Sequence, residues 1–114
     1  MLIYKKRFWR SKTSSIVLLH TQKRNNIRFS ESLRTKFNEE NVQSELVDAI
    51  IEMLFHYDVL PSSSIPVLIC WFVGPSAIEM ERLSDGLVGQ LCHEVLCNYL
   101  NISPESHPLD QVVK

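Results

Sequence analysis

The sequence predicts a small α+β domain whose strands come first and whose last part is a helix–strand–helix unit, in the order β-β-(β)-α-β-α. Short β-branched apolar runs occur in the first third of the chain. Apolar residues recur at spacings of three and four after residue 39, and one continuous apolar run separates the two helical patterns. Because strands and helices are largely segregated, we expect a small mixed sheet with an early β-hairpin region and helices packed on it.

The size and composition of the chain fit one folded domain. Its 114 residues are 45% hydrophobic and 22% charged, far from the composition of disordered chains. We assign residues 1–103 to a single α+β domain. Residues 104–114 begin with Pro104 and include Pro108 among small polar residues, so they are predicted to form a flexible C-terminal tail.

The first elements are predicted to be short strands. Residues 2–9 mix apolar and charged side chains and fit either a strand or one side of a short basic helix. Residues 16–21 are apolar and begin with β-branched side chains, which favours a strand. Asn25 and Asn26 tolerate the left-handed backbone of a tight turn, after which residues 27–29 would return antiparallel.

A first amphipathic helix is predicted over residues 39–58. Asn38 is a good N-cap, and the acids Glu39 and Glu40 complement the positive end of the helix dipole. Proline and three serines at 61–64 would end the helix. The predicted core stripe consists of Val42, Leu46, Ile50, Met53, Leu54 and Tyr57.

The apolar run at 65–73 predicts the central strand, and a long helix is predicted to follow it. The run has no polar residue and no alternation, as expected of a strand covered on both faces. Ser76 and Glu79 form a capping-box pattern, so the helix would begin at about Ala77 and continue to about Leu100. At 1.5 Å per residue it would be roughly 36 Å long, which is more than a small sheet needs. Part of it would then be free to cover a partner.

The cysteines indicate the cellular location of the protein, and the longest apolar run indicates whether it can span a membrane. Cys70, Cys92 and Cys97 are odd in number and lie in apolar segments, which is typical of reduced, buried thiols. We therefore expect an intracellular protein, with the cytoplasm favoured. The longest apolar run is about half of the roughly 20 residues that a membrane span needs, so no membrane contact is expected. Cys92 and Cys97 lack the paired spacings of zinc sites, and we expect no metal or other cofactor.

Charge is distributed very unevenly along the chain. Residues 1–36 carry 10 of the 12 basic groups and one of the 13 acids. Such a segment indicates an anionic partner, but a basic, acid-poor leader for mitochondrial import has the same composition. Residues 16–21 resemble folded structure, which argues against a leader. A third alternative is that the acidic helices of the same chain neutralise the segment.

A candidate nucleic-acid site lies within this basic segment. Residues 4–12 interleave five cations with three aromatic side chains. Cations neutralise phosphates, while flat rings stack on unpaired bases. The alternative is a solvated strand whose aromatic residues enter the core. The residues of the candidate site are Lys5, Lys6, Arg7, Trp9, Arg10 and Lys12.

A candidate protein interface lies on the predicted long helix. Gly86 and Gly89 would each cost about 1 kcal/mol relative to alanine inside a helix, which indicates a close neighbour. That neighbour is either another element of the same chain or a partner's helix, such as that of a second copy. The predicted interface consists of Gly86, Gly89, His93, Leu96 and Leu100.

No catalytic residue is predicted from the sequence. The four histidines lie far apart in the chain, and no serine or cysteine sits in a nucleophile motif. Residues 67–103, an apolar strand followed by Gly74-Pro75-Ser76 and a long helix, resemble the second half-repeat of the tautomerase superfamily. That family uses an amino-terminal proline as catalytic base. Here residue 2 is leucine and the first proline is Pro61, so the resemblance does not supply the base.

These observations favour a binding and assembly module rather than an enzyme. It would act through protein–protein contacts of the long C-terminal helix, as a homo-oligomer or with a protein partner, and it would carry a basic N-terminal face. The alternatives are a nucleic-acid-binding protein that uses residues 4–12 and a small tautomerase-like enzyme.

Overall fold

The computed structural model describes residues 1–10, 13, 15–18, 27–54, 56–59 and 66–113. They form a small α+β domain with a five-stranded sheet in the order β2-β3-β4-β1-β5. The strands are β1 (Leu2–Tyr4), β2 (Ser15–Val17), β3 (His56–Val59), β4 (Val67–Cys70) and β5 (Leu109–Val112). The helices are α2 (Glu31–Glu39), α3 (Ser44–Met53), α4 (Pro75–Met80) and α5 (Asp85–Leu100), followed by the 3₁₀ turn η1 (Pro104–Ser106). The predicted fold class is confirmed.

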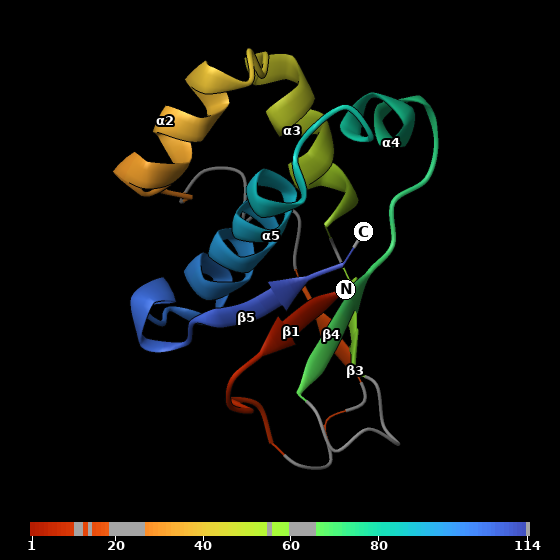
Figure 1. Ribbon diagram of the computed structural model, residues 1–114. Coiled ribbons are helices and arrows are strands. Elements are labelled where there is room, and N and C mark those ends of the chain that lie inside the picture. Colours follow the sequence, from red (N-terminus) through yellow and green to blue (C-terminus); the bar gives the residue numbers. More distant parts are fainter. Residues whose placement is uncertain (11–12, 14, 19–26, 55, 60–65, 114) are drawn as a thin grey trace.

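Every pair of neighbouring strands in the sheet is antiparallel, so the predicted mixed sheet is wrong in this detail. Strand β1 lies between β4 and β5 and is antiparallel to both. Strands β4 and β5 therefore run in the same direction, and the chain segment that joins them contains α4 and α5. Figure 1 shows α5 across one face of the sheet, with α2, α3 and α4 gathered above it.

Helix α5 is the centre of the core. Ser84 is its N-cap, and the serine side chain accepts a hydrogen bond from the amide of Leu87 at 3.2 Å. Asn101 ends the helix in the left-handed conformation, with φ 57°. All residues from Leu91 to Cys97 are buried, so the helix is covered on every side over two turns. A helix with no polar face is expected in the middle of a core rather than on its surface.

The predicted helix over 39–58 is wrong, because the chain forms two shorter helices and a strand there. Helix α2 ends at Glu39, and Asn41 takes a left-handed conformation with φ 55°. Helix α3 begins at Ser44, and residues 56–59 form β3 instead of a last helical turn. Asparagine tolerates a positive φ better than other non-glycine residues, so the two helices can turn sharply at this point.

The predicted helix over 77–100 is also divided. Gly74, with φ 88°, precedes α4, and a turn over residues 81–84 separates α4 from α5. Ser84 rather than Ser76 caps the long helix, which ends at Leu100 as predicted. At 1.5 Å per residue, α5 is about 24 Å long, close to the span of a small sheet. Helix α5 is therefore not longer than the sheet requires, and its length no longer indicates a partner.

Two further predictions about the chain ends and turns need correction. Residues 109–112 form β5 and pair with β1, so they are part of the sheet rather than of a flexible tail. Residues 27–29 form no strand, and the main chain of Arg28 instead exchanges hydrogen bonds with the side chain of Asn98 on α5. The strands predicted near residues 2 and 16 are present as β1 and β2. The predicted turn at Asn25 and Asn26 lies outside the described residues.

Candidate functional site

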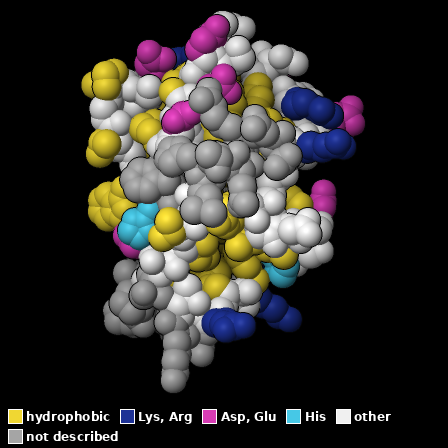
Figure 2. Space-filling model, turned by 180° about the vertical axis from the view of Figure 1, so that it is seen from behind, with side chains coloured by type: hydrophobic (Ala, Val, Ile, Leu, Met, Phe, Trp, Pro, Cys, Tyr) yellow, Lys and Arg dark blue, Asp and Glu magenta, His cyan; other side chains and the backbone are white. Residues whose placement is uncertain are grey.

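The basic segment leaves the sheet at the end of β1. The side chains of Lys5, Lys6, Arg7 and Arg10 are exposed, and within the described part of the chain none of them pairs with a carboxylate. Lys12 lies outside the described residues. Figure 2 shows lysine and arginine side chains at the lower end of the molecule with no carboxylate next to them, whereas other lysine and arginine side chains lie near carboxylates in the upper half. The segment therefore presents a positive surface and is not neutralised by the described acidic side chains.

The aromatic residues of this segment point inward. The ring of Tyr4 lies 4.9 Å from that of Phe8 and 5.8 Å from that of Trp9, in edge-to-face arrangements. Phe8 and Trp9 also contact each other, at 5.0 Å, and both pack against the core. Trp9 is thus half-buried by its own domain and does not present the free ring face that base stacking requires.

The predicted helix interface falls mostly inside the domain. A Cβ atom at Gly89 would lie 2.2 Å from Cγ2 of Val112, so the close neighbour of this glycine is β5 of the same chain. His93 and Leu96 are buried as well. Of the five predicted residues, Gly86 and Leu100 remain exposed, at the two ends of α5. Packing against Val112 of the same chain therefore explains why position 89 is a glycine, and this glycine does not indicate a partner.

The face of the sheet opposite α5 is not covered by a described helix. Cross-strand pairing puts Val17 opposite His56 on this face. Asp58 is paired with Ile69 there. The indole Nε1 of Trp71 donates a hydrogen bond to Asp58 Oδ2 at 3.0 Å, which places Trp71 on the same face. We call Val17, His56, Asp58, Ile69 and Trp71 the open face.

The open face carries large apolar side chains in contact with solvent. Trp71 is 66% exposed and Val17 is 59% exposed. Val73, two residues beyond Trp71, is 78% exposed. The prediction that this strand is covered on both faces is therefore wrong, although β4 does occupy the middle of the sheet as predicted. Within the run, Val67 and Leu68 are buried, whereas Cys70 and Phe72 are only half-buried.

Asp58 is the polar centre of the open face. Its Oδ1 lies 2.9 Å from Nε2 of His56, and its Oδ2 accepts the hydrogen bond from Trp71. Both oxygens of the carboxylate are therefore engaged with neighbours on the same face. The hydrogen bond to Asp58 favours one orientation of the indole ring, with much of the ring surface in contact with solvent.

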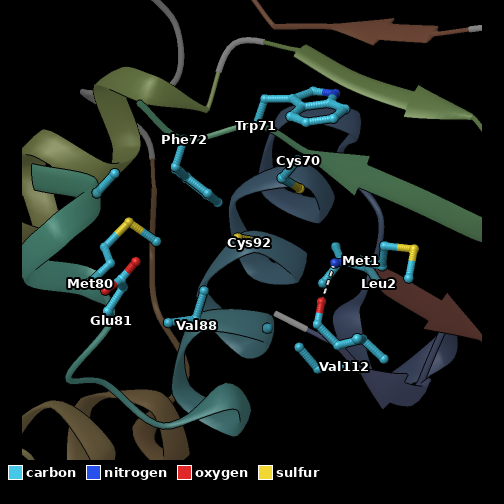
Figure 3. Close-up of a pocket in the computed structure, with 13 residues that line it drawn as sticks. Met1, Leu2, Cys70, Trp71, Phe72, Met80, Glu81, Val88, Cys92 and Val112 are labelled. Atoms are coloured by element: carbon cyan, nitrogen blue, oxygen red, sulfur yellow. Dashed lines mark hydrogen bonds between the residues drawn. The ribbon is translucent and has the colours of Figure 1, made fainter. Parts of the chain in front are cut away.

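A cavity of about 320 Å³ lies between the ends of β1 and β4, helix α4 and the first half of α5. Figure 3 shows Phe72, Met80 and Val88 on one side of this cavity, with Met1 and Val112 on the other. Cys70 and Cys92 also line it. The walls are largely apolar, and the cavity has the volume of a small ligand site.

A buried hydrogen-bond network links β1, α5 and η1. The hydroxyl of Tyr4 is 2.8 Å from Nδ1 of His93, and Nε2 of His93 is 3.0 Å from the carbonyl oxygen of Pro104. Because a carbonyl only accepts, Nε2 carries the proton and Nδ1 accepts from the tyrosine. Burial lowers the pKa of His93, so the neutral ring is the form that fits this network.

Cys97 lies beside His93, at 3.6 Å from Nδ1 and 3.7 Å from Nε2. A catalytic cysteine–histidine pair needs a thiolate, which is favoured by a lowered cysteine pKa. Here burial raises the pKa of Cys97 to about 12, and the carboxylates of Glu94 and Glu105 act in the same direction. The pair is therefore arranged for packing and not for nucleophilic attack.

The His93 network should make the domain less stable in weak acid. The pKa of the His93 side chain is about 6.5 in the unfolded chain and lower in the folded chain. At pH values between the two, the unfolded chain therefore binds more protons than the folded chain. The free energy of unfolding should be unaffected by this group above about pH 7 and should decrease as the pH falls through 6.5. Urea titrations at pH 5 to 8 measure this slope. The substitution His93→Gln should flatten this slope. Equal slopes in wild type and His93→Gln would contradict the assignment.

Glu94 is a second buried polar group that sequence reasoning missed. It is 2% exposed, and its carboxylate accepts hydrogen bonds from the amide and the hydroxyl of Ser30, both at 2.7 Å. It also accepts one from Nε2 of Gln90 at 2.9 Å, and Oε1 of Gln90 accepts from Nζ of Lys36 at 2.8 Å. Ser30 is the N-cap of α2, so the network fixes the start of that helix on α5.

A comparison of the chain with protein-family models, with curated proteins and with solved structures found no match. The resemblance to tautomerases therefore rests on residues 67–103 alone, and Leu2, where a catalytic proline would be expected, is a buried core residue of β1. Within the described residues, no three histidine, cysteine or carboxylate side chains are grouped so as to hold a metal ion. No helix there has the length and hydropathy needed to cross a bilayer.

Proposed function

We propose that this chain is a non-enzymatic binding and assembly module that associates with a second copy of itself through the open face. The exposure of Trp71 and Val17 on a sheet that is covered by helices on its other face carries the proposal. Two sheets packed face to face bury alternate residues of both, which is the arrangement of a β-sandwich. Large apolar side chains that meet solvent on such a face typically mark an interface.

The charges on the open face are compatible with self-association. Its one carboxylate, Asp58, is engaged by His56 and by Trp71, so two copies can meet without bringing unpaired like charges together. The net charge of the chain is −1, which gives little long-range repulsion between copies. The contact surface proposed here replaces the helix face, whose central residues are occupied by packing within the domain.

Sedimentation velocity over a wide range of protein concentration tests the proposal. We expect a dimer of the 13.2 kDa chain, and we expect Trp71→Glu and Val17→Glu to shift the equilibrium to monomer, because each puts a charge into the interface. Ile78→Glu is the matched control, since Ile78 is 72% exposed but lies on α4. A wild-type monomer at all concentrations, or dissociation by Ile78→Glu alone, contradicts the proposal.

The exposed cations support a second candidate function, the binding of nucleic-acid phosphates. Lys5, Lys6, Arg7 and Arg10 are exposed, and none pairs with a described carboxylate. Binding of this kind weakens with salt at a log–log slope of about −0.9 per phosphate contact on duplex DNA. Because Trp9 is packed inside, single strands should gain no stacking advantage over duplex. Absence of a complex at about 50 mM salt and tens of micromolar protein would exclude this candidate.

A further inference from the structure

Two of the three cysteines meet between the sheet and the central helix. Cys70 is the last residue of β4, and Cys92 lies in the middle of α5. Tyr57 connects their positions, because it pairs with Cys70 across the sheet and its hydroxyl donates to the carbonyl oxygen of Cys92 at 2.8 Å. Both cysteines line the same cavity, and the neighbouring Cys70 side chain is among the causes that raise the pKa of Cys92. Figure 3 shows Cys70 on the strand above the helix that carries Cys92.

The two thiols differ in their access to solvent. Both line the cavity of about 320 Å³ described above. Cys70 is half-buried, whereas Cys92 is 1% exposed. A small uncharged molecule that enters this largely apolar cavity therefore meets Cys70 before Cys92.

We propose that Cys70 and Cys92 are a hydroperoxide-sensitive thiol pair, in which Cys70 reacts first and Cys92 then closes a reversible disulfide that ties β4 to α5. The proposal is independent of the open-face function, because it needs only the cavity that Cys70 and Cys92 both line. Cys97 belongs to a different environment, in which its sulfur contacts the ring of His93.

The oxidation proceeds in two steps. The thiolate sulfur of Cys70 attacks one oxygen of a hydroperoxide, so that an S–O bond forms, the O–O bond breaks, and the other oxygen leaves with a proton as water or an alcohol. The sulfur of Cys92 then attacks Sγ of Cys70, an S–S bond forms, and the S–O bond breaks. The departing hydroxide takes up the proton of Cys92 as water. Two thiols are oxidised by two electrons in all, and the hydroperoxide is reduced.

The surroundings of the sulfurs support this order of events. The neighbouring side chain of Cys70, together with burial, raises the pKa of Cys92, so the thiolate of Cys92 is scarce at neutral pH and Cys92 is a poor first nucleophile. Its position beside Cys70 instead suits it to resolve an oxidised neighbour. Burial raises the pKa of Cys97 to about 12, which makes Cys97 a poor nucleophile by the same criterion and a suitable control.

Peptide mapping after treatment with hydrogen peroxide tests the proposal. Trypsin cleavage after Arg82 separates peptide 37–82, which contains Cys70, from peptide 83–114, which contains Cys92 and Cys97. We expect a linked pair of these peptides, about 2 Da lighter than their sum, that a thiol reductant separates. The intact oxidised protein should also melt at a higher temperature than the reduced protein, because the disulfide restricts the unfolded chain.

Single variants identify the partners in the linked pair. Cys97→Ser should keep the linked peptides, whereas Cys70→Ser and Cys92→Ala should lose them, and circular dichroism establishes that each variant is folded. Linkage through Cys97, or oxidation of Cys70 to its sulfinic acid without a linked pair, overturns the proposal. Three fully alkylatable thiols in wild-type protein after peroxide treatment overturn it as well, and that result depends on no variant.

Discussion

Leu68→Ala is expected to lower the free energy of unfolding by about 2–5 kcal/mol, a large share of the stability of a small domain. Leu68 is fully buried in β4, the middle strand of the sheet, and its side chain lies on the face covered by α5. Truncation removes buried methyl groups and leaves a cavity between strand and helix that the packed surroundings cannot fill. Urea unfolding followed by circular dichroism measures the change.

Trp71→Ala is the matched control for this prediction. Trp71 follows the same strand but lies on the open face, and the substitution removes one exposed hydrogen bond to Asp58. At protein concentrations at which the chain is monomeric, so that no association contributes to stability, we expect a loss of about 1 kcal/mol or less. Equal costs at the two positions under these conditions would show that the strand is covered on both faces within one chain, and would remove the basis of the proposed interface.

The apolar run at 65–73 shows which parts of the fold the sequence predicts. A run of this length and composition is enough to place a strand in the middle of the sheet, because only an interior strand is tolerated with so few polar residues. It does not show which face is covered. Leu68 and Trp71 of this run are both apolar, but Leu68 is buried and Trp71 is exposed. This difference in burial arises because α5 packs on one face of the sheet only.

The helix boundaries could not be predicted because the competing signals are local and similar. Ser76 with Glu79 and Ser84 with Asp85 both read as helix starts, and the turn at 81–84 between them has no proline or glycine to mark it. Likewise β3 follows α3 after two residues, and Tyr57 fits the helical stripe as well as the sheet. Tertiary packing decides between such alternatives.

For the candidate sites, the sequence predicted solvent exposure correctly only for charged side chains. The cations of residues 5–10 are exposed as their composition indicates, but Trp9 turns inward to Tyr4 because a half-buried ring stabilises the end of β1. Gly89 correctly indicated a close neighbour on α5, but Val112 comes from a segment whose two prolines suggested a tail. Nothing in the sequence pairs Ser30 with Glu94, since the two are 64 residues apart.

Glu94→Ala is expected to cost about 3 kcal/mol of unfolding free energy, the second large effect. The carboxylate accepts two hydrogen bonds from Ser30 and one from Gln90, and the net contribution of a hydrogen bond to a charged group is about 1.5–3 kcal/mol. Its removal leaves the amide of Ser30 without this acceptor and frees the start of α2 from α5. Hydrogen exchange should show the loss of protection first in residues 31–39.

A double-mutant cycle with Ser30 separates the network from helix capping. Ser30→Ala removes the hydroxyl that caps α2 through the amide of Leu33, and should cost about 1 kcal/mol alone. Because the two groups share a hydrogen bond, the double variant should lose less than the sum of the single losses. Glu79→Ala, which removes an exposed carboxylate from α4, should change stability by no more than about 0.5 kcal/mol. Strictly additive losses at Ser30 and Glu94 would mean that the bond from the Ser30 hydroxyl to Glu94 does not contribute to stability, and that any anchoring of α2 by Glu94 depends on the main-chain amide of residue 30.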